Sequence, residues 1–560
     1  MEQVWQSMYD KFAISQTITL PDENSSLLDI YDRSMQLFAD RTAFIHQNHR
    51  LSYAQLDRYS LALAKYLQSL ELEQGSRIAL MMPNCLQYYV AVMGVIRAGH
   101  IVVNVNPLYT ARELAHQLND SHAQGIILIQ SAVDTLAEIQ QETSIRHIFT
   151  TQLDDFYSEL SQAATTDDGI QVGELAAISL PQAIVTAEHF NYQRPNLKLH
   201  DTCVLQYTGG TTGVSKGTEL SHANLIANIL QCDEMFKNEL GGLGATEPNY
   251  PHLCAIPLYH IFAFTVCALF GLYKGQANIL VSNPRDLPVL IDAIEQHKPA
   301  LFPSVNTLYH ALVHNERFQQ LDHSSLRIAM GGGMPVLPAT AEKWQQITGL
   351  TILEAYGLSE TSPVATCNPT QHRHFSGMIG IPVPSTDVAI LDDDGNIIPA
   401  GAVDDDGEPI AGEIAIRGPQ VMKGYWNRPD ETAKVMTADG FFRSGDIGIM
   451  DKDGFAKIVD RKKDMILVSG FNVYPTEIEQ VVTHHAKVLE AAAIGVFDEH
   501  SGEVPKLFVV KKDDSLTAEE ILSYARQHLT GYKVPKYVEF IAELPKSNVG
   551  KILRKNLRDA

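Results

Sequence analysis

The chain has 560 residues, of which 45% are apolar and 19% are charged, and its formal net charge at pH 7 is −23. This length exceeds what one hydrophobic core organises, so two or more domains are expected, with the composition of a soluble globular protein. The negative charge argues against nucleic acid as a partner and against charge-driven binding to anionic lipid.

The first 150 residues alternate between predicted helices and strands. Ser26 and Ser52 each precede an amphipathic run and are typical N-caps of helices over 27–38 and 53–70. Asn84 is expected to open a third helix over 85–99. Such alternation predicts a mainly parallel sheet covered by helices. The expected strands lie at 77–82, 101–105 and 125–130.

The polar, weakly patterned residues 151–196 are expected to form a partly ordered excursion. They are followed by an apolar run, 203–207, which suits a buried strand, and then by the glycine-rich stretch YTGGTTGVSKGTEL at 207–220. Glycines let backbone N–H groups approach an anion, hydroxyls add donors, and Lys216 supplies a mobile cation. This stretch predicts a phosphate-binding loop, with a plain glycine-rich hairpin as the alternative.

A P-loop is excluded for this stretch. That motif needs two glycines with four residues between them, followed by Lys and Ser or Thr. Counting from Gly210, Ser215 stands where the second glycine belongs, and Gly217 follows the lysine.

The uncharged stretch 254–273 has the length of a membrane span. It contains Pro257, His260 and Gly271 and has no basic flank, so a buried strand, loop and helix is the preferred interpretation. His260 alone is more often a core residue than a functional one. The N-terminal stretch MEQVWQSMYDKFAISQ has neither a basic nor an apolar signal-peptide region. The six cysteines form no CxxC pair and predict buried thiols of a reducing compartment.

Two later strands run into turns that suit ligand binding. One is 328–330, which precedes three consecutive glycines, and the other is 352–355, which precedes YGLSET. Ligands bind at the carboxyl ends of strands in open parallel sheets. Further on, Asp446 lies in a Ser-Gly-Asp turn, where a carboxylate can accept two hydrogen bonds from ribose hydroxyls. Arg461, after a short strand, could also reach that ribose.

The remaining chain predicts two smaller units. Between 388 and 419, two acidic turns at 392–395 and 404–407 are expected to be solvated hairpin tips of a small β-barrel-like part, because neither has a twelve-residue calcium loop. The fold class is therefore α/β, with a large N-terminal region, residues 1–461. A small mobile α+β C-terminal domain, residues 462–560, has the size of a separate unit.

The glycine-rich stretch resembles the phosphate loop of the adenylate-forming enzymes, which include acyl-CoA synthetases, luciferases and peptide-synthetase adenylation domains. It departs from the common form TSGTTGxPKG by Gly209 for serine and Ser215 for proline, so one hydroxyl is lost. The resemblance covers nearly the whole chain and is closest to bacterial long-chain fatty-acid–CoA ligases. It rests on VVNVNPLYTARELAHQLNDS, LQYTGGTTGVSKG, DRKKDMILVSGFNVYP, LTGYKVPK and ELPKSNVGKILR.

This resemblance implies a role for each matching residue. Tyr356 would stack on adenine, with the three glycines packed against it. Asp446 and Arg461 would bind the ribose. Thr361 would bond the α-phosphate, and Glu360 with Thr211 would hold a magnesium ion (Mg²⁺), a hard cation for which one or two carboxylates suffice beside phosphate oxygens. The remaining ATP- or CoA-binding residues implied are Thr208, Gly209, Gly210, Thr211, Thr212, Gly213, Lys216, Gly331, Gly332, Gly333, Gly357, Ser469, Gly470 and Phe471.

The resemblance also implies a moving lid. Lys551, in the terminal Gly-Lys-Ile motif, would be the catalytic lysine, and His260 would lie along the wall where the acyl chain and its carboxylate enter. The lid would rotate at a hinge near Lys463, first presenting Lys551 and then the segment 469–471 to coenzyme A.

The implied activity is that of a long-chain fatty-acid–CoA ligase that feeds fatty-acid uptake and β-oxidation. ATP and a fatty acid would give an acyl-adenylate and pyrophosphate, and coenzyme A would then give acyl-CoA and AMP. The alternatives are a ligase for medium-chain or aryl acids, or a fatty acyl-AMP ligase that loads a carrier protein. A non-enzymatic lipid carrier and a kinase or ATPase are weaker alternatives. The protein is expected to be cytoplasmic, in weak contact with the inner face of the cell membrane, and a homodimer is left open.

Overall fold

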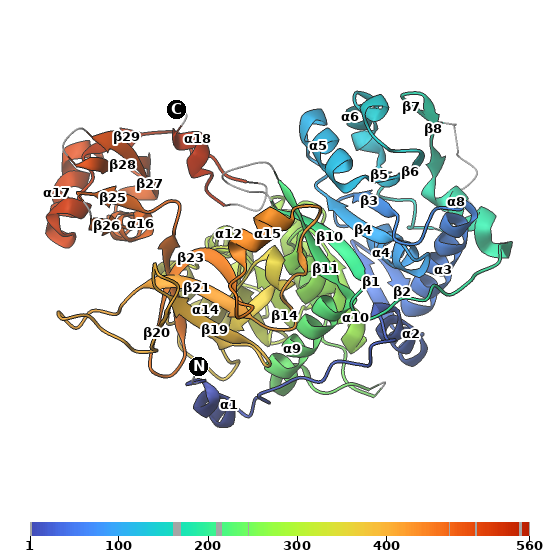
Figure 1. Ribbon diagram of the computed structural model, residues 1–560, viewed down its shortest axis with the longest axis horizontal. Helices are drawn as coiled ribbons and strands as arrows, with labels where there is room; N and C mark the ends of the chain where they lie inside the picture. Colours follow the sequence, from blue (N-terminus) through green and yellow to red (C-terminus); the bar gives the residue numbers. More distant parts are fainter. Residues whose placement is uncertain are drawn as a thin grey trace.

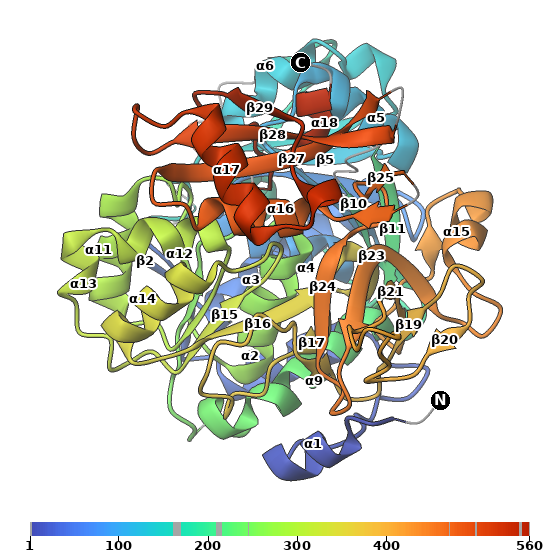
Figure 2. The same cartoon turned by 90° about the vertical axis from the view of Figure 1, so that its left-hand side faces the viewer.

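The computed structural model describes residues 3–158, 160, 170–208, 215–244, 246–469, 471–498, 501–547 and 551–558. Figure 1 shows a large N-terminal region and a smaller C-terminal domain that lies beside β23 (Phe442–Met450). The predicted α/β class, with mainly parallel sheets and a C-terminal domain, is confirmed. Figure 2 shows the same C-terminal domain, in red, above the N-terminal sheets.

An eight-stranded sheet has the order β22-β11-β10-β4-β3-β5-β6-β9. Its central strands run parallel, as the strand–helix alternation predicts, whereas β11 and β22 pair antiparallel at one edge. The strands are β3 (Arg77–Met81), β4 (Ile101–Val105), β5 (Gly125–Ile129), β6 (His147–Thr151), β9 (Ile178–Ser179), β10 (Thr202–Thr208), β11 (Lys216–Ser221) and β22 (Gly424–Tyr425). Beside them lie β7 (Gln171–Val172) and β8 (Leu175–Ala176).

A nine-stranded sheet has the order β18-β17-β16-β15-β14-β12-β13-β1-β2. The run from β16 to β1 is parallel, and antiparallel strands close both edges. The strands are β1 (Thr42–His46), β2 (His49–Ser52), β12 (His252–Cys254), β13 (Asn278–Leu280), β14 (Leu301–Ser304), β15 (Ile328–Gly331), β16 (Ile352–Gly357), β17 (Val364–Cys367) and β18 (Ile381–Pro382).

The helices fill the space between and around these sheets. α4 is buried at every residue because it packs against strands of both sheets. Ser26 and Ser52 cap their helices as predicted. The helices are α1 (Gln6–Phe12), α2 (Leu27–Leu37), α3 (Tyr53–Ser69), α4 (Leu86–Arg97), α5 (Ala111–Ser121), α6 (Val133–Ala137), α8 (Leu180–Thr186), α9 (His222–Leu240), α10 (Phe270–Lys274), α11 (Leu287–His297), α12 (Asn306–Val313), α13 (Glu316–Gln319), α14 (Pro338–Thr348) and α15 (Pro429–Val435).

Asn84 does not have the predicted role of opening α4. The residue at the N-cap is Cys85, which makes no side-chain cap bond, and the amide of Asn84 instead bonds the backbone of two other strands. The stretch 254–273 is the predicted buried strand end, loop and helix, and its helix begins as a π-helix, η5 (Ala263–Leu269). Across the described residues, no helix combines the length and apolarity needed to cross a membrane. All six cysteines are buried and free.

The predicted β-barrel-like part is an open antiparallel sheet of five strands, in the order β20-β19-β21-β23-β24. It does not close, because β20 and β24 are its two edges. The acidic turn at 392–395 joins β19 to β20 as a hairpin tip, as expected. The strands are β19 (Asp387–Leu391), β20 (Ile397–Ile398), β21 (Gly412–Arg417), β23 (Phe442–Met450) and β24 (Ala456–Arg461).

The C-terminal domain has its own hydrophobic cluster, centred on residues such as Ile466, Leu507 and Ile521. Its sheet has the order β26-β25-β28-β27, with β29 parallel to β28. The elements are β25 (Ile466–Val468), β26 (Phe471–Val473), α16 (Pro475–Thr483), β27 (Val488–Asp498), β28 (Gly502–Lys511), α17 (Ala518–His528), β29 (Tyr537–Phe540) and α18 (Arg554–Arg558). The sequence pattern predicted this α+β arrangement.

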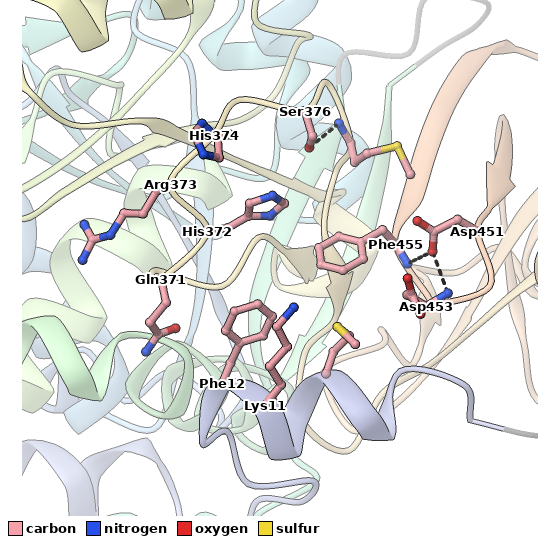
Figure 3. A pocket seen from close by; sticks show the side chains of 12 residues that line it. Lys11, Phe12, Gln371, His372, Arg373, His374, Ser376, Asp451, Asp453 and Phe455 are labelled. Carbon is pink, nitrogen blue, oxygen red and sulfur yellow. Dashed lines mark hydrogen bonds between the residues drawn. The ribbon is translucent and has the colours of Figure 1, made fainter.

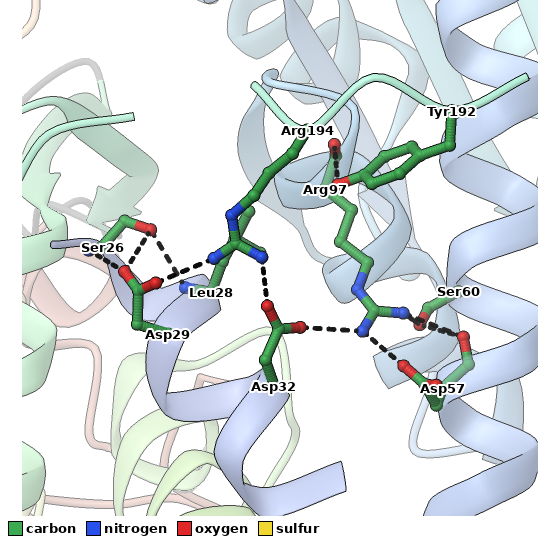
Figure 4. Close-up of polar contacts among 9 residues, drawn as sticks. All are labelled: Ser26, Leu28, Asp29, Asp32, Asp57, Ser60, Arg97, Tyr192 and Arg194. Atoms are coloured by element: carbon green, nitrogen blue, oxygen red, sulfur yellow. Dashed lines mark hydrogen bonds and ion pairs between the residues drawn. The ribbon is translucent and has the colours of Figure 1, made fainter. Parts of the chain in front are cut away.

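The end of the excursion 151–196 is fastened to the body by ion pairs (Figure 4). Arg194 bonds Asp29 of α2 at 2.9 Å and also contacts Asp32. Asp32 in turn pairs with Arg97, whose guanidinium also reaches Asp57 of α3 at 2.5 Å. The described part of the excursion is therefore ordered where it rejoins the sheet.

Candidate active site

The carboxylate of Asp446 lies where the nine-stranded sheet meets the five-stranded sheet. It is buried on β23, and Oδ2 accepts a hydrogen bond of 2.7 Å from the hydroxyl of Tyr356, at the end of β16. Arg461, paired with Asp446 across β23 and β24, places its Nε 3.2 Å from Oδ1. Burial raises the pKa of Tyr356 well above its usual value, so its hydroxyl stays a donor. The proposed adenine and ribose residues are thus in direct contact.

Glu360 is a buried carboxylate in the turn after β16. Its Oε1 accepts a hydrogen bond of 2.8 Å from the hydroxyl of Tyr425, on β22. Burial raises the pKa of Glu360, which the hydrogen bond from Tyr425 partly opposes. Among the described residues, no cationic side chain lies within ion-pair distance of this carboxylate. The next residue, Thr361, is buried, and its hydroxyl accepts from the N–H of Leu358 at 2.9 Å.

Lys216, within the glycine-rich stretch 207–220, is the first residue of β11. Its ammonium bonds Glu431 at 2.7 Å and lies 4.9 Å from the centre of the Tyr425 ring. The hydrogen bond from Lys216 lowers the pKa of Glu431 to about 2, and a second one from Lys434 adds to this effect. Because the Tyr425 hydroxyl also bonds Glu360, this lysine and the candidate magnesium carboxylate contact the same tyrosine.

Two of the glycines at the strand ends, Gly332 and Gly357, leave no room for a side chain. A Cβ on Gly332 would lie 3.0 Å from the ring of Phe262, and one on Gly357 would lie 1.8 Å from the carbonyl oxygen of Pro363. Gly333 has a φ of +75°, which favours glycine. Gly331 ends β15 and Thr208 ends β10, so both lie at carboxyl ends of parallel strands. The structure therefore gathers these predicted residues at one edge of each sheet.

Lys551 comes from the opposite end of the chain. Residues 551–553, just before α18, lie on the side of the C-terminal domain that faces the N-terminal region (Figure 1). The backbone of Lys551 is held by Ser547, whose Oγ accepts from its N–H at 3.1 Å. Burial lowers the pKa of Lys551 to about 8, and Arg461 adds to this, whereas Asp446 and Glu360 act in the opposite direction. The lysine thus lies close enough to these groups for their charges to act on it.

His260 lies in the same neighbourhood, in the loop between β12 and the π-helix. Burial lowers the pKa of His260 to about 4, and the charge of Lys551 acts in the same direction. Its imidazole is therefore neutral at neutral pH, and Nδ1 accepts from the N–H of Phe262 at 3.3 Å. The histidine is a candidate hydrogen-bonding group for a substrate carboxylate, not a second cation.

The predicted coenzyme A segment lies on the C-terminal domain. Ser469 has a φ of +51°, and its N–H bonds the carbonyl of Ser501 at 2.7 Å. Phe471 is 56% exposed and stacks on Tyr532, with 4.8 Å between ring centres. Other large apolar side chains of this domain, Leu467 and Phe497, are exposed as well. The predicted residues outside the described ranges are Gly209, Gly210, Thr211, Thr212, Gly213 and Gly470.

Sequence reasoning missed three groups that hold this site. Tyr425 and Glu431 orient Glu360 and Lys216, and no spacing in the sequence links them to their partners. The third is Glu354, buried on β16, whose Oε1 accepts from the N–H of Val336 at 3.0 Å, beyond the triple-glycine turn. Burial raises the pKa of Glu354 to about 7. In the sequence, Glu354 could have been noticed only as an acidic residue within an otherwise apolar strand, just before Ala-Tyr-Gly.

A separate cavity of about 510 Å³ lies between α1, the loop 371–378 and the turn 451–455. Figure 3 shows His372 and Phe455 on its inner wall and Lys11 at its α1 side. None of the predicted site residues lines it. The candidate active site is therefore identified by its chemistry and not by this cavity.

The comparison with protein families decides how the cluster is interpreted. Residues 31–426 match the AMP-binding enzyme family, and residues 477–551 match the AMP-binding enzyme C-terminal domain. This chain belongs to the AMP-binding enzyme family. The first match ends at the strand that carries Tyr425, and the second ends at Lys551.

Relatives of this AMP-binding enzyme extend over its whole length. It is 48% identical to a long-chain-fatty-acid–CoA ligase of Yersinia pestis, covering 100% of this chain and 98% of that protein. A long-chain-fatty-acid–CoA ligase of Salmonella typhimurium is 46% identical with the same coverage. Among solved structures, ATP-bound MatB of Rhodopseudomonas palustris matches with a TM-score of 0.82 and 27% identity, over 96% of this chain and 99% of that one.

Proposed function

We propose that this AMP-binding enzyme is a long-chain fatty-acid–CoA ligase. It joins ATP and a fatty acid into an acyl-adenylate with release of pyrophosphate, and then transfers the acyl group to coenzyme A with release of AMP. The observation that carries the proposal is the position of Lys551. This C-terminal residue lies close enough to Asp446, Glu360 and Arg461 for their charges to shift its pKa. The names of the two full-length relatives support the choice of substrate.

In the first step, a carboxylate oxygen of the acid attacks the α-phosphorus of ATP. A new O–P bond forms, the bond to the bridging oxygen breaks, and pyrophosphate leaves with its electron pair. We assign Tyr356 to adenine, Asp446 and Arg461 to the ribose, and Thr361 to the α-phosphate. Lys551 would stabilise the charge that grows on the phosphorus oxygens, because positioning and electrostatics are what phosphoryl chemistry chiefly requires.

The same site fits a magnesium ion beside the phosphates. Glu360 is buried and its raised pKa reflects that burial, yet no described cation pairs with it within ion-pair distance. A hard divalent cation that keeps phosphate oxygens and water as its other ligands needs only such a carboxylate, with Thr211 as the second proposed ligand. When bound, the ion would neutralise charge on the phosphate oxygens.

In the second step, the thiol sulfur of coenzyme A attacks the acyl carbon, and the bond to the AMP oxygen breaks. We propose that residues 462–560 rotate about Lys463, relative to residues 1–461, between the two steps. This would withdraw Lys551 and bring the segment 469–471 to the thiol. The exposure of Phe471 in the present arrangement supports the proposal that this segment binds coenzyme A only after the rotation.

The proposed acid is long, and the uncharged stretch 254–273 beside His260 would line its alkyl chain. Such an acid partitions into bilayers, so we propose that the enzyme works in the cytoplasm and meets it at the inner membrane face by weak peripheral contact. A homodimer is compatible with this proposal.

The test is a chain-length series. AMP release is measured with free acids from about six to eighteen carbons, below their micelle concentrations. Each buried methylene contributes about 0.8 kcal/mol, so four extra methylenes should raise the specificity constant by more than about a hundredfold. A maximum with a short or aromatic acid would contradict the long-chain proposal and leave adenylation standing. Acyl transfer to a carrier protein but not to coenzyme A would favour an acyl-AMP ligase.

A further inference from the structure

The loop that carries His260 has no regular hydrogen-bonding ladder of its own. It leaves β12 at Cys254 and reaches the π-helix at Ala263, and most of it is buried. Buried backbone N–H and C=O groups need partners, and Pro257 contributes no N–H. Internal bonds satisfy only a few of them, such as the N–H of His260 to the carbonyl of Pro257 at 3.0 Å. Four further groups, the carbonyls of Cys254, Ile256 and Tyr259 and the N–H of Leu258, are bonded by side chains from elsewhere in the chain.

Asn84 provides most of these bonds. Its buried Nδ2 lies 2.9 Å from the carbonyl of Cys254, 3.0 Å from that of Ile256 and 3.1 Å from that of Val281. Its Oδ1 accepts from the N–H of Leu258 at 2.7 Å. One amide thus fixes the loop on both sides of Pro257 and ties it to the end of β13.

Gln206 holds the same loop from the nucleotide side. Its Nε2 donates to the carbonyl of Tyr259, the residue before His260, at 3.0 Å. Its Oε1 accepts from Asn104 at 3.0 Å, and Asn104 accepts from the hydroxyl of Tyr88 at 2.7 Å. Gln206 belongs to β10, two residues before Thr208, so this buried chain connects the loop to the strand that leads into the phosphate stretch.

A second layer fixes Asn84 itself. The hydroxyl of Ser282 donates to the backbone carbonyl of Asn84 at 2.6 Å and lies 2.7 Å from His46 Nε2. The hydroxyl of Tyr157 lies 2.7 Å from His46 Nδ1. Burial lowers the pKa of His46 to about 4, so the ring is neutral and can accept from Tyr157 while donating to Ser282. A chain of hydrogen bonds therefore runs from Asn84 through Ser282 and His46 to the half-buried Tyr157.

We propose that Asn84 and Gln206 are positioning residues that set where the acid's carboxylate and first methylenes lie along the loop 256–260. This inference rests on the proposed function, because it takes His260 as part of the acid-binding wall. Neither amide needs to touch the substrate. Each acts by holding backbone that would otherwise have several conformations, and a shift of about 1 Å in such a wall can cost about a hundredfold in rate.

The experiment uses near-isosteric variants of the full chain. Asn84→Asp can still accept from Leu258 but places oxygens against three carbonyls, and Gln206→Glu keeps the bond to Asn104 but loses the donor to Tyr259. Gln231→Glu is the matched control, since Gln231 on α9 is also fully buried and loses the same kind of donor, here to the carbonyl of Pro384 at 2.8 Å, while it bonds none of the described residues 256–260. Pyrophosphate exchange gives the KM for the acid, the KM for ATP and kcat, and thermal unfolding gives Tm.

Both test variants should lower kcat/KM for the acid by about 10- to 100-fold, the usual range for leaving buried polar groups unpaired. The KM for ATP should change by less than about threefold, as expected when only acid binding is lost. The control should lower Tm without this split between the two substrates. An equal loss toward acid and ATP, or the same split in Gln231→Glu, would overturn the inference. If Asn84→Asp does not fold, Gln206→Glu decides alone.

Failure of the proposed function has a different signature. In that case the unmodified enzyme would show no exchange that depends on long-chain acid. Failure of the positioning inference instead leaves the unmodified enzyme active and the variants indistinguishable from the control.

Discussion

The two halves of the candidate site are held in different ways. On the N-terminal side, Tyr356, Asp446 and Glu360 sit on strands or the turns that follow them, and each makes a direct side-chain hydrogen bond to a neighbour. Lys551, by contrast, lies on a terminal segment, and within the described residues no acidic side chain approaches its ammonium within ion-pair distance. Under the proposed function, the N-terminal residues would bind ATP throughout, whereas Lys551 would act in the first step and then withdraw.

Electrostatics follows the same division. Lys551 joins Arg461 and Lys463, and each of these cations lowers the proton affinity of the lysine. Cations gathered this closely are unfavourable unless anions offset their charge. Asp446 and Glu360 offset part of it, and the triphosphate of ATP would add further anions, which is consistent with the first step of the proposed reaction.

Removing the charge of Lys551 should have the largest effect. Lys551→Ala should slow adenylation by about 10²- to 10³-fold, the range for losing one transition-state donor, and leave thioester formation from supplied acyl-adenylate intact. Lys555→Ala, an exposed lysine four residues later, is the matched control. The two half-reactions are measured separately, and equal loss in both would mean that the two halves of the site are not divided by stage.

Blocking the movement should separate the halves in the other direction. Lys463→Pro fixes φ at the proposed hinge, so thioester formation should fall by about a hundredfold while adenylation persists. Lys463→Ala serves as control because it removes the charge without restricting the backbone. If Lys463→Pro forms thioester at the normal rate, rotation occurs elsewhere.

Weakening the N-terminal half should affect one substrate. Asp446→Ala should raise the KM for ATP by about 30- to 100-fold, corresponding to roughly 2–3 kcal/mol from two charge-assisted hydrogen bonds. The KM for the fatty acid should change much less. Asp404→Ala, in an exposed acidic turn, is the control. An unchanged KM and kcat for ATP would remove Asp446 from the ribose site.

The smallest effect concerns pH. The pKa of Lys551 is lowered to about 8, and its protonated form is the proposed stabiliser, so the kcat/KM of adenylation should decline as pH rises above about 8. Lys551→Arg should be slower but should lose this decline, because a guanidinium stays charged. A decline that persists unchanged in Lys551→Arg would assign it to another group.

Local patterns predicted the elements well because they report burial one segment at a time. The caps at Ser26 and Ser52, the parallel alternation and the α+β pattern of the C-terminal domain are all confirmed. Asn84 shows the limit of such reasoning. Its position before an apolar run suggested a cap, but its partners are carbonyls about 170 residues and more away along the chain. No local pattern encodes that choice.

The candidate site was predictable to a similar depth. Motif resemblance supplied the candidates, and the structure brings Tyr356, Asp446, Arg461, Glu360 and Lys551 to one place. Motif resemblance could not supply Tyr425 or Glu431. Both reach the site through β11, which pairs with the strand of Tyr425 and carries the Lys216 partner of Glu431, and β11 is about 200 residues away in the sequence. The sequence also suggested a barrel-like closure for what is an open five-stranded sheet, because closure depends on pairing between distant strands.

The exposed side chains of the C-terminal domain carry one more consequence. Phe471, in the segment 469–471 proposed to meet coenzyme A, is 56% exposed, and Phe497 on β27 of the same domain is 82% exposed. If rotation buries them, coenzyme A binding should lower the heat capacity of the system, since removing apolar surface from water does so. Titration calorimetry at several temperatures, with a stable acyl-adenylate analogue in place, would measure this change. We expect a more negative value for coenzyme A than for ATP, and Phe497→Ser should reduce the difference.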